Sequence, residues 1–343
     1  MTDTPRLLEV EPDERYALPP IGGREACPHV FDAQDIRAVN AALAASRPLL
    51  LRGLPGVGKS QLARAAAVHT GRAFVSKVVD ARTESRDLLY TYDAVRRLAR
   101  AQLQATPKFK DEVLLEERYF VEPGVLWWAF DWQGATEQRF RARFGEPPSA
   151  GDERLETLER PWHPDAFDAK RDGVVVLIDE IDKAEESVPN GLLEALGERR
   201  FDALGFEEVA QPGVPPLVVI TTNEERTLPK AFLRRCVVHR MGKGDGYEDW
   251  LFDRGRAHFP DAAILSDDLV RTAAKQLATD RKRLSDLGLA APGQAELIDL
   301  LRTLVVLGPV EAKRRGVSVS KAREELLDDV GEFFFDKNAK HET

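Results

Sequence analysis

The sequence predicts an α/β fold, in which helices sandwich a parallel sheet, followed by a small all-α domain. Short apolar segments typical of buried strands alternate with helix-like segments as far as residue 241. A glycine-rich loop joins the first of these strands to an alanine-rich helix. Beyond residue 245 every remaining segment has helical composition. We therefore expect an N-terminal arm over 1–30, an α/β domain over 31–244, and a helical lid with C-terminal helices over 245–343.

The individual elements follow from local composition. Residues 1–30 are rich in proline and charge, which favours an arm that is partly disordered. The next segments are a helix over 32–46, a strand over 48–52, a helix from Ser60, a strand over 72–81, a helix over 85–103, and strands over 173–182, 215–223 and 236–241. The C-terminal helices are expected over 248–259, 267–288, 292–308 and 320–335.

Composition excludes several classes of protein. The 343 residues carry a formal net charge of -9, which disfavours non-specific binding to nucleic acid or to anionic membranes. The two cysteines, Cys27 and Cys236, form neither a disulfide framework nor a metal-binding spacing. No N-terminal segment resembles a signal peptide, and no apolar run is long enough to span a bilayer. These features predict a cytoplasmic protein with no membrane partner.

The loop between the first apolar strand and the following helix carries the strongest motif. "GLPGVGKS", Gly53 to Ser60, fits the phosphate-binding pattern G-x-x-x-x-G-K-[ST]. Glycines let backbone N–H groups close around phosphates, Lys59 reaches the β- and γ-phosphates, and Ser60 ligates Mg²⁺. An ordinary glycine-rich turn is the alternative, and the strand-loop-helix context disfavours it. The expected nucleotide-binding residues are Gly53, Pro55, Gly56, Val57, Gly58, Lys59, Ser60 and Gln61, together with Asp179.

Two acids end the apolar strand "VVVLIDE". Asp179 lies where ligands of open α/β sheets bind, and it suits the acid that holds Mg²⁺ together with Ser60. Glu180 suits the base that polarises the attacking water. A strand that simply ends in solvated acids is the alternative. Downstream of a phosphate-binding loop, the catalytic interpretation is favoured.

Three further polar residues follow core segments. Asn223 ends "VVITTN" and could hold a water near the γ-phosphate, although asparagine is equally common in turns. Arg234 and Arg235 precede the last strand, and a guanidinium there could neutralise charge on a transferring phosphoryl group. If that group comes from a neighbouring subunit, hydrolysis requires assembly. A pair of surface arginines is the alternative.

The order of these motifs resembles AAA+ ATPases. Within that class, "LIDEIDKAEESVPNGLLEALGERRF" and "LVVITTNEERTLPKAFLRRCVVHRM" resemble the MoxR family, and the similarity covers about residues 30–305. The resemblance implies a P-loop AAA+ sheet with a helical lid, ATP and Mg²⁺ as cofactors, and ATP hydrolysis. It implies Walker A at Lys59 and Ser60, Walker B at Asp179 and Glu180, and sensor 1 at Asn223. It also implies that Arg235 acts in trans as an arginine finger, with Arg234 as second choice.

Two features depart from the family pattern. Relatives carry an arginine, called sensor 2, where this chain has "AAPGQAEL" with Gly293 and Gln294. An insertion at about 104–171 also lengthens the α/β domain. Four of the five tryptophans, Trp127, Trp128, Trp132 and Trp162, lie in this region, and we favour packing over partner binding as their role.

The resemblance implies a ring, most often a hexamer, that remodels or activates a partner protein, such as one with a von Willebrand factor A domain. One alternative is a nucleotide-dependent switch or scaffold in a bacterial conflict-type system, which the missing sensor-2 arginine favours and Glu180 disfavours. Another is the NTPase subunit of a nucleic-acid-acting complex, which the acidic charge disfavours.

Overall fold

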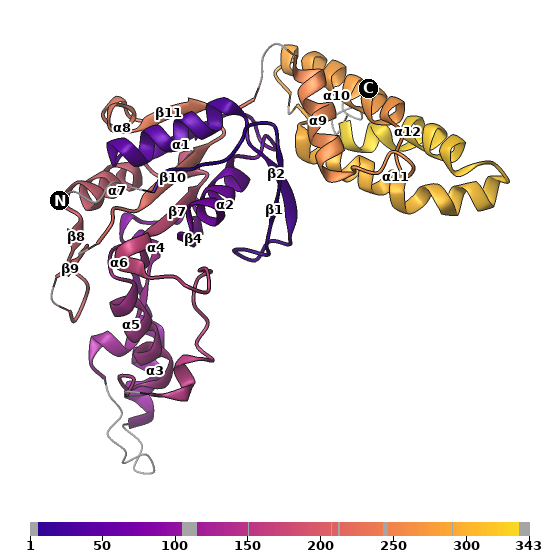
Figure 1. The fold of residues 1–343 in the computed structure, drawn as a ribbon. Helices are drawn as coiled ribbons and strands as arrows, with labels where there is room; N and C mark the ends of the chain where they lie inside the picture. The colour runs from indigo at the N-terminus through magenta and orange to yellow at the C-terminus, as the bar shows by residue number, and fades with distance from the viewer. Residues whose placement is uncertain are drawn as a thin grey trace.

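A computed structural model describes residues 6–104, 115–149, 151–206, 208–211, 213–242, 246–289 and 291–335. The chain forms an α/β body, a narrow arm that extends from it, and a separate group of C-terminal helices (Figure 1). The phosphate-binding loop lies on the side of the body that faces the C-terminal helices, so the fold places it between two parts of the chain.

Five parallel strands form the central sheet, in the order β11-β3-β10-β7-β4. They are β3 (Leu49–Arg52), β4 (Ala73–Val78), β7 (Val174–Asp179), β10 (Leu217–Thr222) and β11 (Val237–Arg240). Leucine, valine and isoleucine dominate the inner strands, whose side chains are buried on both faces. Because all five strands run in one direction, their carboxyl ends share one edge. The predicted α/β fold with a parallel sheet is confirmed.

Helices cover both faces of the sheet. One face packs on α1 (Ala33–Ala45) and α2 (Lys59–Thr70). The other packs on α4 (Val125–Phe130), α7 (Ser187–Glu198) and α8 (Lys230–Arg235). Successive side chains of the inner strands point alternately into the two cores, so both faces of the sheet are covered there.

The N-terminal segment is more ordered than its composition predicts. Within residues 6–30, β1 (Arg15–Leu18) and β2 (Cys27–Val30) form an antiparallel hairpin. Leu8, Leu18 and Ile21 are buried against the core that contains α1 and α2. This order differs from the partial disorder expected from composition, because a few well-spaced apolar side chains are enough to dock the hairpin and average composition conceals them.

The helix predicted over 85–103 is interrupted in the structure. The 3-10 helix η1 (Ser85–Leu88) leads into β5 (Tyr90–Tyr92), and only then does α3 (Ala94–Gln104) begin. β5 pairs with β6 (Val121–Pro123), which lies about 30 positions further along the chain. A strand whose partner is so distant leaves no local signal, and this is why helical composition misled the prediction.

The narrow arm of Figure 1 contains much of the predicted insertion, as far as the structure describes it, whereas α4 packs on the sheet. The elements of the arm are α3, η2 (Glu117–Phe120), α5 (Trp132–Phe144), η3 (Glu153–Leu155) and α6 (Ala169–Asp172). Trp127 and Trp128 are 2% and 3% exposed and pack beneath the sheet, which confirms the packing role for these two. Trp162 O accepts a hydrogen bond from Phe74 N at 2.8 Å, so this segment covers part of the edge strand β4. A second hairpin, β8 (Arg200–Phe201) with β9 (Val209–Ala210), follows α7.

The C-terminal region is entirely helical where it is described. It comprises α9 (Tyr247–His258), α10 (Asp267–Asp286), α11 (Gln294–Arg315) and α12 (Val319–Phe335), which share one apolar core. We call these four helices the lid. Residues 243–245, where the domain boundary was predicted, lie outside the described residues. Among the helices that the structure describes, none is long and apolar enough to cross a membrane.

Candidate nucleotide site

A cavity of about 590 Å³ lies at the carboxyl edge of the sheet, between the α/β body and the lid. This volume is within the range of small-molecule sites. The glycine-rich loop, the ends of β7 and β10, the turn of the N-terminal hairpin and the start of α11 surround it. Lid residues at its wall are His258, Gln294, Ala295, Ile298 and Asp299.

The loop between β3 and α2 is shaped by glycines at close approaches. Gly53 has a φ of +150°, and a Cβ there would lie 2.8 Å from Met241 O. Gly56 has a φ of +78° and faces Ala295 of the lid, with a distance of 3.4 Å from an added Cβ to the Ala295 Cβ. Side chains at these positions would be strained and would push the loop away from its neighbours. Val57 is buried beneath the loop and anchors it.

Lys59 is the buried cation of the site. Its ammonium donates to Gly53 O at 2.7 Å, Leu54 O at 2.9 Å and Asn223 Oδ1 at 2.8 Å. Burial lowers its pKa, and nearby carboxylates, Asp179 first among them, oppose that shift. The ammonium is thus held at the mouth of the loop by neutral oxygens, which a phosphate could replace as partners.

Ser60 and Asp179 meet across the floor of the cavity. Ser60 Oγ donates to the Asp179 carboxylate and lies 2.9 Å from each of its oxygens. Thr221 Oγ1 donates to Asp179 Oδ1 at 2.5 Å and thereby fixes that carboxylate. A hydroxyl and a carboxylate, with room for phosphate oxygens beside them, form the oxygen donor set that Mg²⁺ prefers. The residues present therefore fit Mg²⁺.

Glu180 and Asn223 lie beside this pair. Glu180 adopts a left-handed φ of +63°, and its N–H donates to Thr221 Oγ1 at 2.9 Å. Asn223 Nδ2 donates to Glu180 Oε1 at 3.4 Å, and Lys183 Nζ donates to Glu180 Oε2 at 2.6 Å. A carboxylate and an amide thus share one wall of the cavity, where they could position a water together.

Arg234 and Arg235 lie elsewhere. Both are exposed at the end of α8, and neither lines the cavity of its own chain. Within the part of the chain that the structure describes, neither guanidinium forms an ion pair. The structure therefore brings nine predicted residues to the wall of one cavity and leaves the two arginines apart. The nine are Pro55, Gly56, Gly58, Lys59, Ser60, Gln61, Asp179, Glu180 and Asn223.

Gln294 is the first residue of α11, in the stretch "AAPGQAEL" that carries no arginine. Gly293 is the N-cap residue of α11 and lies against the loop, since an added Cβ would be 3.0 Å from Pro55 O. Gln294 is 8% exposed, and its Oε1 lies 3.8 Å from where a Cβ of Gly58 would be. Among the described lid residues that line the cavity, none is lysine or arginine. The lid therefore presents a neutral amide to the phosphate-binding loop.

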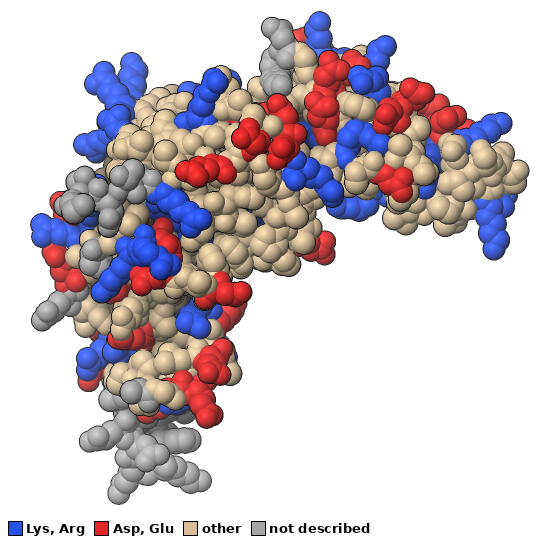
Figure 2. Space-filling view, viewed as in Figure 1, with Lys and Arg blue, Asp and Glu red and all other residues tan. Residues whose placement is uncertain are grey.

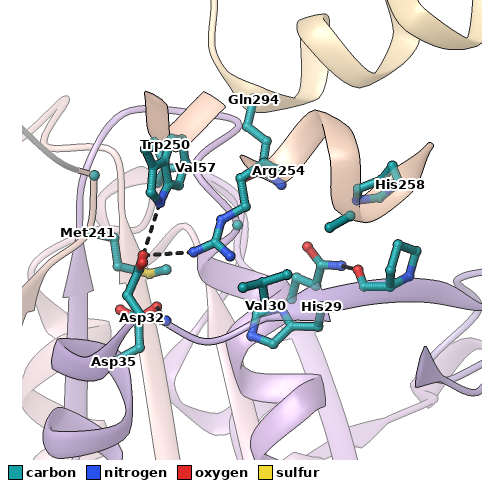
Figure 3. A pocket seen from close by; sticks show the side chains of 15 residues that line it. His29, Val30, Asp32, Asp35, Val57, Met241, Trp250, Arg254, His258 and Gln294 are labelled. Atoms are coloured by element: carbon teal, nitrogen blue, oxygen red, sulfur yellow. Dashed lines mark hydrogen bonds and ion pairs between the residues drawn. The ribbon is translucent and has the colours of Figure 1, made fainter. Parts of the chain in front are cut away.

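A second, smaller pocket of about 20 Å³ lies where the lid meets the α/β body, and its walls include His29 and Val57 (Figure 3). Asp32, at the start of α1, forms an ion pair with Arg254, whose Nη2 lies 2.8 Å from Asp32 Oδ2. The same carboxylate accepts a hydrogen bond from Trp250 Nε1 at 3.0 Å. We call these three residues the lid latch, because they join α9 to α1. Burial, followed by the charge of Arg254, lowers the pKa of His29 to about 3, so the neighbouring imidazole is neutral at pH 7.

Sequence reasoning missed three contributors to the site. Thr221 stands inside the quoted "TTN", and its alternation with the buried strand residues could have suggested that it points to Asp179. Lys183 stands inside the quoted "LIDEIDKA", three positions after Glu180, and no separate sequence signal marks its contact with that carboxylate. Asp32 begins the helix predicted over 32–46, and no local pattern links it to Arg254, which is more than 200 positions away.

A phosphate-binding loop between β3 and α2, opposite a strand that ends in two acids, defines the chain as a P-loop NTPase. The model of the AAA domain family (dynein-related subfamily) matches residues 48–236, more than half of the chain, so the protein belongs to this family. The crystal structure of a candidate ATPase from Cytophaga hutchinsonii is similar over 88% of this chain and 80% of its own, with 14% identity and a TM-score of 0.36. Comparison with curated proteins found no match.

Proposed function

We propose that the protein hydrolyses ATP in the 590 Å³ cavity. The observation that carries this proposal is the convergence of a buried lysine, a hydroxyl–carboxylate pair and a second carboxylate on one cavity. Ser60 donates to Asp179, and Asn223 contacts both Lys59 and Glu180. Each group matches one requirement of phosphoryl transfer: charge neutralisation, metal binding and activation of water. Membership of the AAA family supports the same conclusion.

Each residue has a distinct role in this proposal. The loop amides and the N-terminus of α2 bind the triphosphate, and Lys59 exchanges its carbonyl partners for phosphate oxygens. Asn223, released from Lys59, orients the attacking water. Glu180 accepts a proton from that water as its oxygen attacks the γ-phosphorus. The bond from that phosphorus to the β,γ-bridging oxygen breaks, and ADP leaves with the electron pair. Mg²⁺, held by Ser60 and Asp179, would neutralise charge on the phosphates.

The wider function that we propose is chaperone-like remodelling of a partner protein by a homo-oligomeric ring of the MoxR type. In this proposal a single subunit binds ATP, whereas turnover requires assembly of the ring. Arg235 supports assembly, because an exposed arginine remote from its own cavity is available to a neighbour's phosphates. The partner that we propose is a protein, such as one with a von Willebrand factor A domain. Basic and acidic side chains are interspersed on the face in Figure 2, which gives no support to a nucleic-acid groove.

A nucleotide-dependent switch or scaffold is the second candidate function. The neutral Gln294 at the lid supports it, because an amide gains less than a guanidinium from the γ-phosphate and would distinguish ATP from ADP weakly. Slow turnover that does not change on assembly would favour this candidate over the ring-shaped machine.

Assembly-dependent turnover is the test of the proposed function. We expect ATP turnover per subunit to rise with protein concentration as oligomers appear in mass photometry of the same samples. Arg235→Ala should bind ATP normally and lose about 100-fold or more in turnover, because a finger arginine is worth roughly 10³–10⁵ in other phosphoryl-transfer enzymes. Mixing this variant with Lys59→Ala subunits should restore part of the turnover. The Arg235→Ala subunit keeps an intact phosphate-binding loop, and the Lys59→Ala subunit supplies Arg235 to it.

Arg234→Ala is the matched control for that experiment. It removes the same charge from the adjacent position of α8 and should keep most of the activity. If Arg234→Ala alone loses turnover, the finger is assigned to the wrong arginine. If turnover per subunit is flat while oligomers form, the trans mechanism is wrong.

A further inference from the structure

Both carboxylate oxygens of Glu180 are engaged by neighbouring side chains. Lys183 Nζ donates to Oε2 at 2.6 Å, whereas Asn223 Nδ2 lies 3.4 Å from Oε1. The first contact is a short, charge-assisted hydrogen bond, and the second is at the long limit for a hydrogen bond. Lys183 is therefore the dominant partner of this carboxylate.

The backbone of Glu180 is fixed independently of that ion pair. Its N–H donates to Thr221 Oγ1 at 2.9 Å, and the same hydroxyl donates to Asp179 Oδ1 at 2.5 Å. These contacts hold the residue in its left-handed conformation, with a φ of +63°. The side chain is the part of Glu180 that remains free to move, and the Lys183 ammonium determines where its carboxylate points.

Lys183 lies on the 3-10 helix η4 (Ile181–Lys183), and it is not among the residues that line the 590 Å³ cavity. Glu180 and Asn223 do line the cavity, where the attacking water must be activated. The ion pair thus holds the carboxylate to a cation outside the cavity. The Oε2 lone pair that accepts from the ammonium is not available to accept a proton from water, and the ion pair limits how far the rest of the carboxylate can turn toward that water.

We propose that Lys183 restrains Glu180 in the resting protein, so that ATP binding and water activation are controlled by separate contacts. The inference rests on the proposed function, in which Glu180 is the base. ATP replaces the partners of Lys59, including Asn223, but leaves the pair between Lys183 and Glu180 in place. Breaking that pair is the second step, and its equilibrium limits basal turnover.

Lys183→Met tests the proposal because methionine keeps most of the length of the side chain and removes its charge. The pair is partly exposed, with side-chain exposures of 40% and 30%, so freeing the base should raise basal ATP turnover by about two- to five-fold. ATP affinity should not change. Lys183→Arg keeps an ion pair and should remain near the wild-type rate. Lys275→Met, on an exposed face of α10, removes the same charge far from the site and should have no effect.

Unchanged or reduced turnover in Lys183→Met, at unchanged ATP affinity and with a melting curve like that of the wild type, would overturn the proposal. A reduction would show that Lys183 supports Glu180 instead of restraining it. The same experiment separates this failure from failure of the proposed function. In that second case the wild type itself would show no turnover that depends on Lys59 and Glu180.

Discussion

Replacing Glu180 by glutamine is expected to lower ATP turnover by about 100-fold or more while ATP still binds. Glutamine keeps the size of the side chain and an oxygen that can accept from Asn223 Nδ2, but it cannot accept a proton from water. General-base catalysis typically contributes roughly 10²–10⁴-fold, which sets the size of the loss. Steady-state phosphate release and equilibrium ATP binding, measured on the same preparation, separate the two effects.

Glu185→Gln is the matched control for this change. Glu185 is an exposed acid just after η4, and it does not line the cavity. Its replacement should leave turnover within about two-fold of the wild type, as expected for a surface charge. If Glu180→Gln behaves like this control, the base has been assigned to the wrong residue.

Replacing Asp32 by alanine is expected to destabilise the contact between the lid and the α/β body by about 3 kcal/mol. The change leaves the Arg254 guanidinium, whose side chain is only 7% exposed, without its carboxylate. It also leaves the Trp250 N–H without its acceptor. Removing one partner of a buried ion pair is costly because the other charge remains buried. In urea, fluorescence of the tryptophans should report lid separation before far-UV circular dichroism reports loss of helices.

Asp249→Ala provides the comparison for the lid latch. Asp249 also pairs with an arginine, Arg271, but its side chain is 77% exposed. Loss of that pair should cost less than about 1 kcal/mol. The double variant Asp32→Ala/Arg254→Met should recover part of the stability, since no charge is then left unpaired. Equal urea midpoints for Asp32→Ala and Asp249→Ala would contradict the assignment of the latch.

The sheet and the polar residues at its edge could be predicted because their signals are local. Each inner strand is an apolar run of a few residues, and parallel strands bring the residues that follow them to one edge. Lys59, Asp179 and Asn223 therefore fall together without any knowledge of the tertiary contacts.

The remaining features depend on contacts between distant segments. β5 requires β6 as its partner, and the N-terminal hairpin requires the apolar surface of α1 and α2. The link from Asp32 to Arg254 exists only because the lid folds back onto the start of α1. Packing of this kind overrides local propensity and has no sequence period.

Binding of ATP to the wild type and to Lys59→Ala, measured by titration calorimetry in the presence of Mg²⁺, tests the central claim most directly. Lys59 is expected to donate to the phosphates, and charge-assisted hydrogen bonds of this kind are worth about 1.5–3 kcal/mol. We predict saturable binding to the wild type and an affinity at least about ten-fold lower for a Lys59→Ala variant that melts normally. Equal affinities for the two proteins would contradict the assignment of this cavity as the nucleotide site.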